Sequence, residues 1–240
     1  MLLSLLVVWE VYARASMARG QASYTSFPPP SAALQDAYAL LSQGLLLDHA
    51  LASLTRVYVG FALAAVVAIP LGVLMGLNKM ANAQLSPLVN IIRPIPPVAW
   101  VPIMILWFGV TDTQQYFVIF IGTVFPLLLN TIAGVQGVDP VIRRAALSLG
   151  ADRSALFRVV VRAGMPDILL GARVALGMGW FTIVASEMVA AANGLGFMIT
   201  EARTAMLTQR LYVSMAAIGL IGLLQDQLLV WLQRRLVPWQ

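Results

Sequence analysis

Long runs of apolar residues, separated by short polar segments, constrain this chain more than any other feature. A transmembrane helix needs about 20 predominantly apolar residues to cross a bilayer. Only 10% of the 240 residues are charged and 60% are hydrophobic, whereas a soluble domain carries about 25% charged residues. Because so little charge cannot cover a soluble surface, the sequence predicts an all-α, polytopic membrane protein with about six transmembrane helices. The expected spans are, approximately, residues 1–13, 55–77, 87–108, 116–135, 168–191 and 212–232.

The first apolar run is shorter than the others. Residues 1–13 have no basic segment before them and no clear small-residue cleavage site, so a signal peptide fits poorly. We expect residues 1–13 to be the outer part of a first transmembrane helix. The natural chain could then begin with further residues before Met1. Residues 31–48 show helical spacing of apolar residues with polar residues between them, which suits a helix lying in the membrane interface.

Basic residues gather at the ends of the apolar runs and in the loops between them. With six spans, Lys79, the six arginines between 143 and 173, and Arg234-Arg235 fall on one side, and five arginines fall on the other. Lysine and arginine accumulate on the cytoplasmic side of membrane proteins. We therefore expect both termini in the cytoplasm. The net charge of +5 reflects this topology, and no nucleic-acid partner is expected.

The sequence lacks the residues that several kinds of site require. It has no cysteine and a single histidine, His49, so no metal site is expected. No glycine is followed directly by a lysine, which excludes the phosphate-binding loop G-x-x-x-x-G-K-[ST]. An intramembrane enzyme would need a nucleophile–base pair or metal ligands, and Glu187 with His49 does not supply one. We expect one domain, residues 1–240, that has no enzymatic activity and no cofactor of its own.

A polar, basic segment at about residues 138–166 interrupts the apolar pattern. Asp139-Pro140 is a turn signal, and a helical pattern follows it as far as Gly150, a residue type common just after a helix end. A second short helix is expected from about Asp152 to Pro166. The apolar positions of the first helix lie on one face and are Ile142, Ala145, Ala146 and Leu149. From the residue pattern alone, this helix-turn-helix is either a docking element or a positively charged loop that only sets topology.

The same segment resembles a known motif. Arg144-Ala145-Ala146, three further residues, Gly150 and a later Pro166 are similar to the EAA loop of bacterial ABC importer permeases. The sequence departs from that loop at Arg144, where the family has glutamate, and at Arg162, where a proline is common. Other stretches resemble the branch of this family that imports taurine, alkanesulfonates and nitrate. These stretches are Arg93-Pro94-Ile95-Pro96-Pro97-Val98-Ala99-Trp100, Leu106-Trp107-Phe108-Gly109, Gly194-Leu195-Gly196-Phe197 and Arg234-Arg235-Leu236.

The resemblance implies the membrane subunit of an ATP-driven importer of type I architecture in the bacterial cytoplasmic (inner) membrane. Its implied partners are a second copy of the chain, two ATP-binding subunits that carry ATP and Mg²⁺, and a periplasmic or lipid-anchored binding protein. Transport would proceed by alternating access. The implied contacts with the ATPase are Arg144, Ala145, Ala146, Leu149, Gly150, Ala151 and Pro166.

The substrate implied by the resemblance is a small anion, such as taurine or another alkanesulfonate. A permease for nitrate or bicarbonate is the alternative. A stand-alone secondary transporter is a weaker alternative, because such proteins usually show inverted repeats and paired broken helices, which this sequence does not.

Several residues within the apolar runs are candidates for the translocation pathway. Prolines remove backbone donors, and broken helices at membrane depth are tolerated where they face protein or water. The pathway candidates are Arg93, Pro96, Pro97, Trp100, Trp180 and Glu187. Alternatives remain open: Arg93 could extend to the interface, the two tryptophans could be packing residues, and Glu187 could pair with Arg56 or Arg93.

A glycine-rich break follows the fifth apolar run. Gly194, Gly196 and Phe197 resemble the extracytoplasmic hairpin that, in the family, meets the binding protein, and the alternative is an ordinary loop. His49 is expected to be exposed at the end of a loop.

Overall fold

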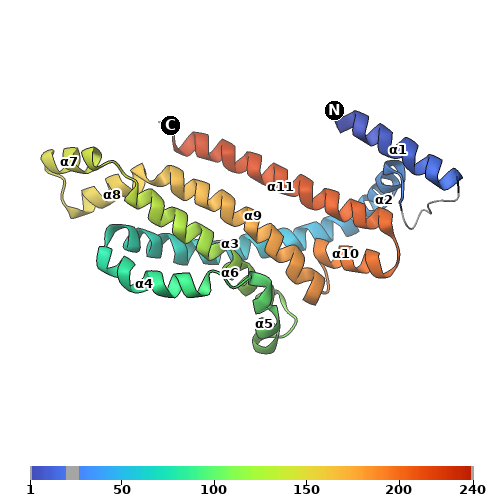
Figure 1. Cartoon of the computed structure of the whole chain (residues 1–240), viewed down its shortest axis with the longest axis horizontal. Coiled ribbons are helices and arrows are strands. Elements are labelled where there is room, and N and C mark those ends of the chain that lie inside the picture. The colour runs from blue at the N-terminus through green and yellow to red at the C-terminus, as the bar shows by residue number, and fades with distance from the viewer. Residues whose placement is uncertain (1, 20–26, 239–240) are drawn as a thin grey trace. The chain divides into compact units, whose positions relative to one another are not determined.

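The computed structural model describes residues 2–19 and 27–238. This part of the chain consists of helices joined by short segments and contains no β-strand, which confirms the predicted all-α fold. The helices (Figure 1) are α1 (Leu2–Ala18), α2 (Pro30–Ser42), α3 (Leu45–Leu77), α4 (Lys79–Ile92), η1 (Pro97–Trp100), α5 (Val101–Phe108), α6 (Asp112–Gln136), α7 (Pro140–Ser148), α8 (Arg153–Ala163), α9 (Met165–Ala190), α10 (Leu195–Thr204) and α11 (Thr208–Leu236).

Four of these helices, α3, α6, α9 and α11, are long and apolar enough to cross a membrane. A fifth candidate is the pair formed by α4 and the helical stretch Pro97–Phe108, which meet at an 80° bend. Helix α1 covers the first apolar run, but its 17 residues leave it outside this set. The chain is therefore a multi-pass membrane protein with four or five candidate spans in the part that the structure describes.

The third apolar run, predicted as a span at 87–108 broken by prolines, starts earlier in the structure and is bent at those prolines. Helix α4 begins at Lys79, because the Asn78 side chain accepts hydrogen bonds from the Met80 and Ala81 amides at 2.9 and 3.3 Å and so caps the helix. The chain then bends before α5. Proline fixes its own backbone angle and disfavours helix in the residue before it, and the Arg93–Pro97 segment contains three prolines. The break predicted from the prolines is present, with one helical piece on each side of it.

By the packing of their backbones, the residues form two compact units. The terminal unit comprises Met1–Thr55 and Ile183–Gly222, and the central unit comprises Arg56–Thr182 and Leu223–Gln240. Helices α3, α9 and α11 contribute residues to both. That the chain acts as one domain stays a prediction.

Glycines bring helices of the central unit into close contact. A Cβ added at Gly60 would lie 2.6 Å from the Ile119 side chain, and one added at Gly76 would lie 2.6 Å from the Val135 side chain. Small residues at such positions let transmembrane helices approach closely. The buried core of this unit is apolar and contains Ala64, Ala68, Met75, Val89, Val124, Leu127, Leu128 and Ala175.

Two glycines of α9 give a matched test of this packing. A Cβ at Gly171 would lie 2.5 Å from the Cβ of Asn130 on α6, whereas one at Gly177 would meet nothing within 4 Å. We expect Gly171→Ala to lower the midpoint of thermal unfolding in detergent, because overpacking costs about 1–3 kcal/mol. Gly177→Ala should leave the midpoint nearly unchanged. Equal midpoints for the two variants would show that the contact between α6 and α9 is not tight.

Candidate functional site

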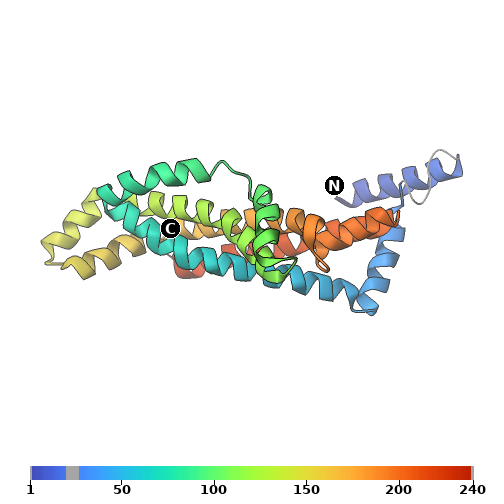
Figure 2. The ribbon, with the colours of Figure 1, turned by 90° about the horizontal axis from the view of Figure 1, so that it is seen from below.

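The predicted helix-turn-helix is present as α7 and α8, which we call the elbow (residues 139–164). It lies at one end of the central unit, beyond the end of α6 (Figures 1 and 2). The Asp139 carboxylate accepts a 2.7 Å hydrogen bond from the Val141 amide, and Pro140 occupies the first turn of α7. Both features favour a helix start. The Asp152 carboxylate caps α8 by accepting a 2.8 Å bond from the Ala155 amide.

Gly150 makes the corner between the two helices. Its φ of +78° lies in the left-handed region that favours glycine. The amide of Ala151 donates to the Ala146 carbonyl at 3.0 Å, and the Gly150 amide donates to the Leu147 carbonyl at 3.0 Å. This is the pattern of a glycine-terminated helix. Hydrogen bonds from Ala155 and Ser154 hold the pKa of Asp152 below its ordinary value, because they favour the charged carboxylate.

The elbow carries apolar side chains that no part of the described chain covers. No residue of α7 is buried, and the Leu149 side chain is 89% exposed. Ala145 is exposed and Ala146 is half-buried, on the predicted face with Leu149. The other large exposed apolar residues of the elbow are Val141, Ile142, Leu147 and Phe157. Large contiguous apolar patches on a protein surface mark interaction sites, so the elbow is a candidate for one.

The elbow is attached firmly at its base. Arg143 Nη2 donates a 2.7 Å hydrogen bond to the Val135 carbonyl at the end of α6. Gly134 and Gly164 lie so close that a Cβ on either would come within 2.8 Å of the other's carbonyl oxygen. The buried side chains of Val73, Val135, Val138 and Val160 form a small apolar core there. These contacts fix the base of the elbow to the end of α6.

Substitutions at Arg143 and at its neighbour Arg144 test this attachment. Arg144 is exposed and makes only a 3.4 Å bond to the Pro140 carbonyl within its own helix. We expect Arg143→Met to speed amide hydrogen exchange of α7 roughly tenfold or more, because hydrogen bonds to charged groups contribute about 1.5–3 kcal/mol. Arg144→Met should have a much smaller effect. Equal exchange rates in the two variants would contradict an anchoring role for Arg143.

The predicted coupling residues are not all in one place. Arg144, Ala145, Ala146, Leu149, Gly150 and Ala151 belong to α7 and the corner that follows it. Pro166 instead stands at the second position of α9, where a missing amide is tolerated. Its position suits the start of a span rather than the exposed surface of the elbow.

The candidate pathway residues fall into separate groups. Arg93 and Pro96 are exposed at the bend between α4 and η1, and Pro97 and Trp100 are the first and last residues of η1. Trp180 is buried, and its indole Nε1 donates a 2.9 Å hydrogen bond to Gln225 Oε1 on α11. That bond favours the packing alternative for Trp180.

Glu187 organises a buried cluster in the terminal unit. Its side chain is 1% exposed, and its carboxylate accepts hydrogen bonds from Ser53 Oγ at 2.8 and 2.9 Å and from the Gly196 amide at 2.9 Å. Ser53 Oγ in turn accepts from the Leu195 amide at 2.9 Å. The Gly196 amide in the first turn of α10 thus meets the carboxylate directly, and the Leu195 amide reaches it through Ser53. A negative charge at this position is what a helix N-terminus favours.

The glycine-rich hairpin is part of this cluster. Gly194 and Gly196 are buried, while Phe197 is half-buried and stacks on the His49 ring at 6.1 Å. His49 Nδ1 accepts a 2.9 Å hydrogen bond from the Gly194 amide. The prediction that His49 is simply exposed at a loop end was wrong, because the histidine lies within α3 and packs on the hairpin. Of the three residues predicted to contact a binding protein, Phe197 has the most accessible side chain.

Two side-chain contacts have no counterpart in the sequence predictions. The first is the hydrogen bond from Ser53 to Glu187, because no sequence motif marks Ser53 as a partner of that carboxylate. Arg56, a buried residue considered as a partner of Glu187, forms an ion pair with Asp112 in the central unit, with nitrogen–oxygen distances of 2.6 and 2.7 Å. This pair could have been expected, because topology places the two charges on the same side of the membrane.

The elbow thus has exposed apolar residues on its surface and is fixed at its base to α6. Residues 68–240 match the family of binding-protein-dependent transport system inner membrane components. The chain belongs to this family. The permease is 43% identical over 203 residues to a putative ABC transporter permease of Methanocaldococcus jannaschii, with 84% of this chain and 76% of the relative covered.

Three further relatives indicate the branch of the family that the chain resembles. The permease is 37% identical over 241 residues to the taurine transport system permease of Escherichia coli, with 98% of this chain and 86% of the relative covered. It is 35% identical to a bicarbonate transport system permease of Synechococcus elongatus, with 97% and 86% covered. A nitrate import permease of Synechocystis is 34% identical, with 98% and 86% covered. The predicted resemblance to the taurine and nitrate branch of ABC importer permeases is confirmed.

The fold has a solved counterpart. A structure of the MetNI methionine ABC transporter in inward-facing conformations matches with a TM-score of 0.70, covering 81% of this chain and 97% of that chain at 18% identity. At that identity the likeness concerns the fold alone. It confirms the expected ABC importer permease architecture.

Proposed function

We propose that the permease is the transport subunit of an ATP-driven importer for a small anion, such as taurine or another alkanesulfonate. Two copies form the pathway, two ATP-binding subunits bind the elbows, and a binding protein delivers the substrate from the other side. ATP and Mg²⁺ bind to the partner subunits, and the permease does not hydrolyse ATP. Its orientation places both termini and the elbow in the cytoplasm.

The proposal rests on the structure of the elbow in this member of the permease family. The elbow combines exposed apolar residues, Leu149 above all, with a tight attachment to α6 through Arg143 and the Gly134–Gly164 contact. A partner that binds this surface with different affinity in two ATPase states shifts the permease between inward- and outward-facing forms. The elbow must be exposed to be bound and stiff to transmit the movement.

The bend between α4 and η1 is the part of the chain best suited to face the pathway. Arg93 and Pro96 are exposed there, and Arg93 supplies a positive charge for an anion. Non-helical backbone at membrane depth is tolerated where it lines a cavity or is buried in protein. We assign Arg93, Pro96, Pro97 and Trp100 to the pathway wall or gate, and Glu187 and Trp180 to its structural support.

Reconstitution with candidate partners tests the proposal. Proteoliposomes containing the permease, its ATPase and its binding protein should accumulate labelled taurine only when ATP is present on the ATPase side. Nitrate and bicarbonate are the competing substrates, favoured by the relatives named for them, and should be tested in parallel. Uptake by the permease alone, driven by an ion gradient, would identify a secondary transporter and overturn the proposal.

A further inference from the structure

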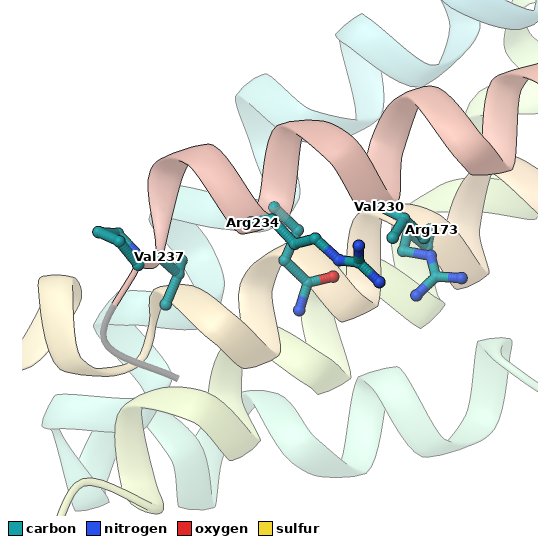
Figure 3. Close-up of a pocket in the computed structure, with 6 residues that line it drawn as sticks. Arg173, Val230, Arg234 and Val237 are labelled. Atoms are coloured by element: carbon teal, nitrogen blue, oxygen red, sulfur yellow. The ribbon is translucent and has the colours of Figure 1, made fainter.

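A pocket lies between α9 and the C-terminal part of α11. Its volume is about 460 Å³, and it is lined by Arg173, Val230, Gln233, Arg234, Val237 and Pro238 (Figure 3). All six residues belong to the central unit. The pocket thus joins two arginines and an amide to an apolar wall.

The two arginines differ in how their charges are balanced. Arg173 is held by Asp226, with Nε and Nη2 donating to the carboxylate at 2.8–3.1 Å. These bonds leave Nη1 of Arg173 without a partner among the described residues. Arg234 has no carboxylate partner within residues 2–19 and 27–238. Arg234 therefore gives the pocket one uncompensated positive charge, and Arg173 gives it a hydrogen-bond donor held in place by Asp226. Both suit a singly charged oxyanion.

The surroundings of the pocket place it at the edge of the bilayer. Helices α9 and α11 are both candidate spans, and Arg234 lies two residues before the end of α11. The Arg235 guanidinium stacks on the exposed Trp231 ring at 5.0 Å. Tryptophan and arginine at the end of a span are typical of the headgroup region. The adjoining surface of α11 is apolar and exposed, at Leu224, Leu228, Leu232 and Leu236.

We propose that this pocket binds the phosphate of an anionic phospholipid, with Arg234 and Arg173 Nη1 as donors and Val230, Val237 and Pro238 against the glycerol and upper acyl chain. A phosphodiester head group carries the single negative charge that the pocket lacks. Basic pockets between transmembrane helices bind anionic head groups in this way. A soluble phosphate shares the chemistry but would not use the apolar wall or its lipid-facing position.

Native mass spectrometry of the full-length permease from mixed micelles tests this assignment. The protein is incubated with equal amounts of phosphatidylglycerol and phosphatidylcholine before mild delipidation. We expect retained phosphatidylglycerol in the wild type and about fivefold less in Arg234→Gln. Arg235→Gln is the matched control, because that neighbour stacks on Trp231 and does not line the pocket, and it should retain lipid as the wild type does.

Two further arms complete the test. Arg234→Lys should restore retention, which separates a charge contact from a folding defect in Arg234→Gln. Inorganic phosphate at millimolar concentration should not displace phosphatidylglycerol; displacement would keep the phosphate site but assign it to a soluble anion. Equal retention in Arg234→Gln and Arg235→Gln, or no preference for phosphatidylglycerol over phosphatidylcholine, would overturn the proposal.

Discussion

Ala146→Asp should abolish ATP-driven uptake while leaving the permease inserted in the membrane. Ala146 lies on the apolar face of α7 with Leu149; Ala146 is half-buried and Leu149 is exposed. A carboxylate at this position would have to be buried against the docking partner, and an unpaired buried charge costs several kcal/mol. A loss of that size lowers affinity by more than a hundredfold.

The measurement is uptake by reconstituted proteoliposomes together with co-purification of the ATPase. Ser148→Asp adds the same charge to α7, at an exposed position outside the apolar face, and should retain most of the uptake. The permease variant should still be extracted from the membrane as folded protein. Normal transport by Ala146→Asp would remove the elbow from the coupling mechanism.

Gly194→Ala is expected to prevent the folded permease from accumulating. Gly194 has φ +115°, and an added Cβ would fall within 2.5 Å of three atoms of the Glu187 carboxylate. That carboxylate cannot withdraw easily, because Ser53 and the Gly196 amide hold it. Backbone strain and steric overlap therefore act together in a buried cluster.

Gly44 provides the control for this substitution. It also has a left-handed backbone, with φ +77°, but nothing lies within 4 Å of an added Cβ. Gly44→Ala should cost only the left-handed strain of about 1–2 kcal/mol. Folded yield is measured by size-exclusion chromatography in detergent. If Gly194→Ala and Gly44→Ala gave equal yields, the cluster around Glu187 would not hold the hairpin in place.

The elbow could be predicted from sequence because its determinants are local. Asp139-Pro140, Gly150 and Asp152 each act on residues within a few positions, and the apolar face repeats at helical spacing. The bend at 93–97 was also signalled by its prolines. The apolar pattern predicts the start of this span at 87, whereas α4 begins at Lys79, because capping by the Asn78 side chain does not appear in an apolar pattern.

The cluster around Glu187 could not be predicted, because its partners are remote in sequence. Ser53 and Glu187 are separated by 134 positions. No sequence motif around Ser53 or the nearby His49 indicates that they contact this cluster. An intramembrane carboxylate indicates that some partner exists. It does not indicate that the partner is the N-terminus of a short helix only nine positions further along the chain.

Thiol accessibility at Leu149 tests the central claim most directly. The chain contains no cysteine, so Leu149→Cys introduces a unique thiol at the most exposed apolar position of the elbow. Its modification by a membrane-impermeant maleimide should be rapid in the permease alone and strongly slowed when the ATPase is bound. Met206→Cys, at a position 69% exposed in the terminal unit, should react equally in both states. Equal reactivity of the Leu149→Cys thiol with and without the ATPase, or labelling only from the extracytoplasmic side, would contradict the elbow as the point where the ATPase acts.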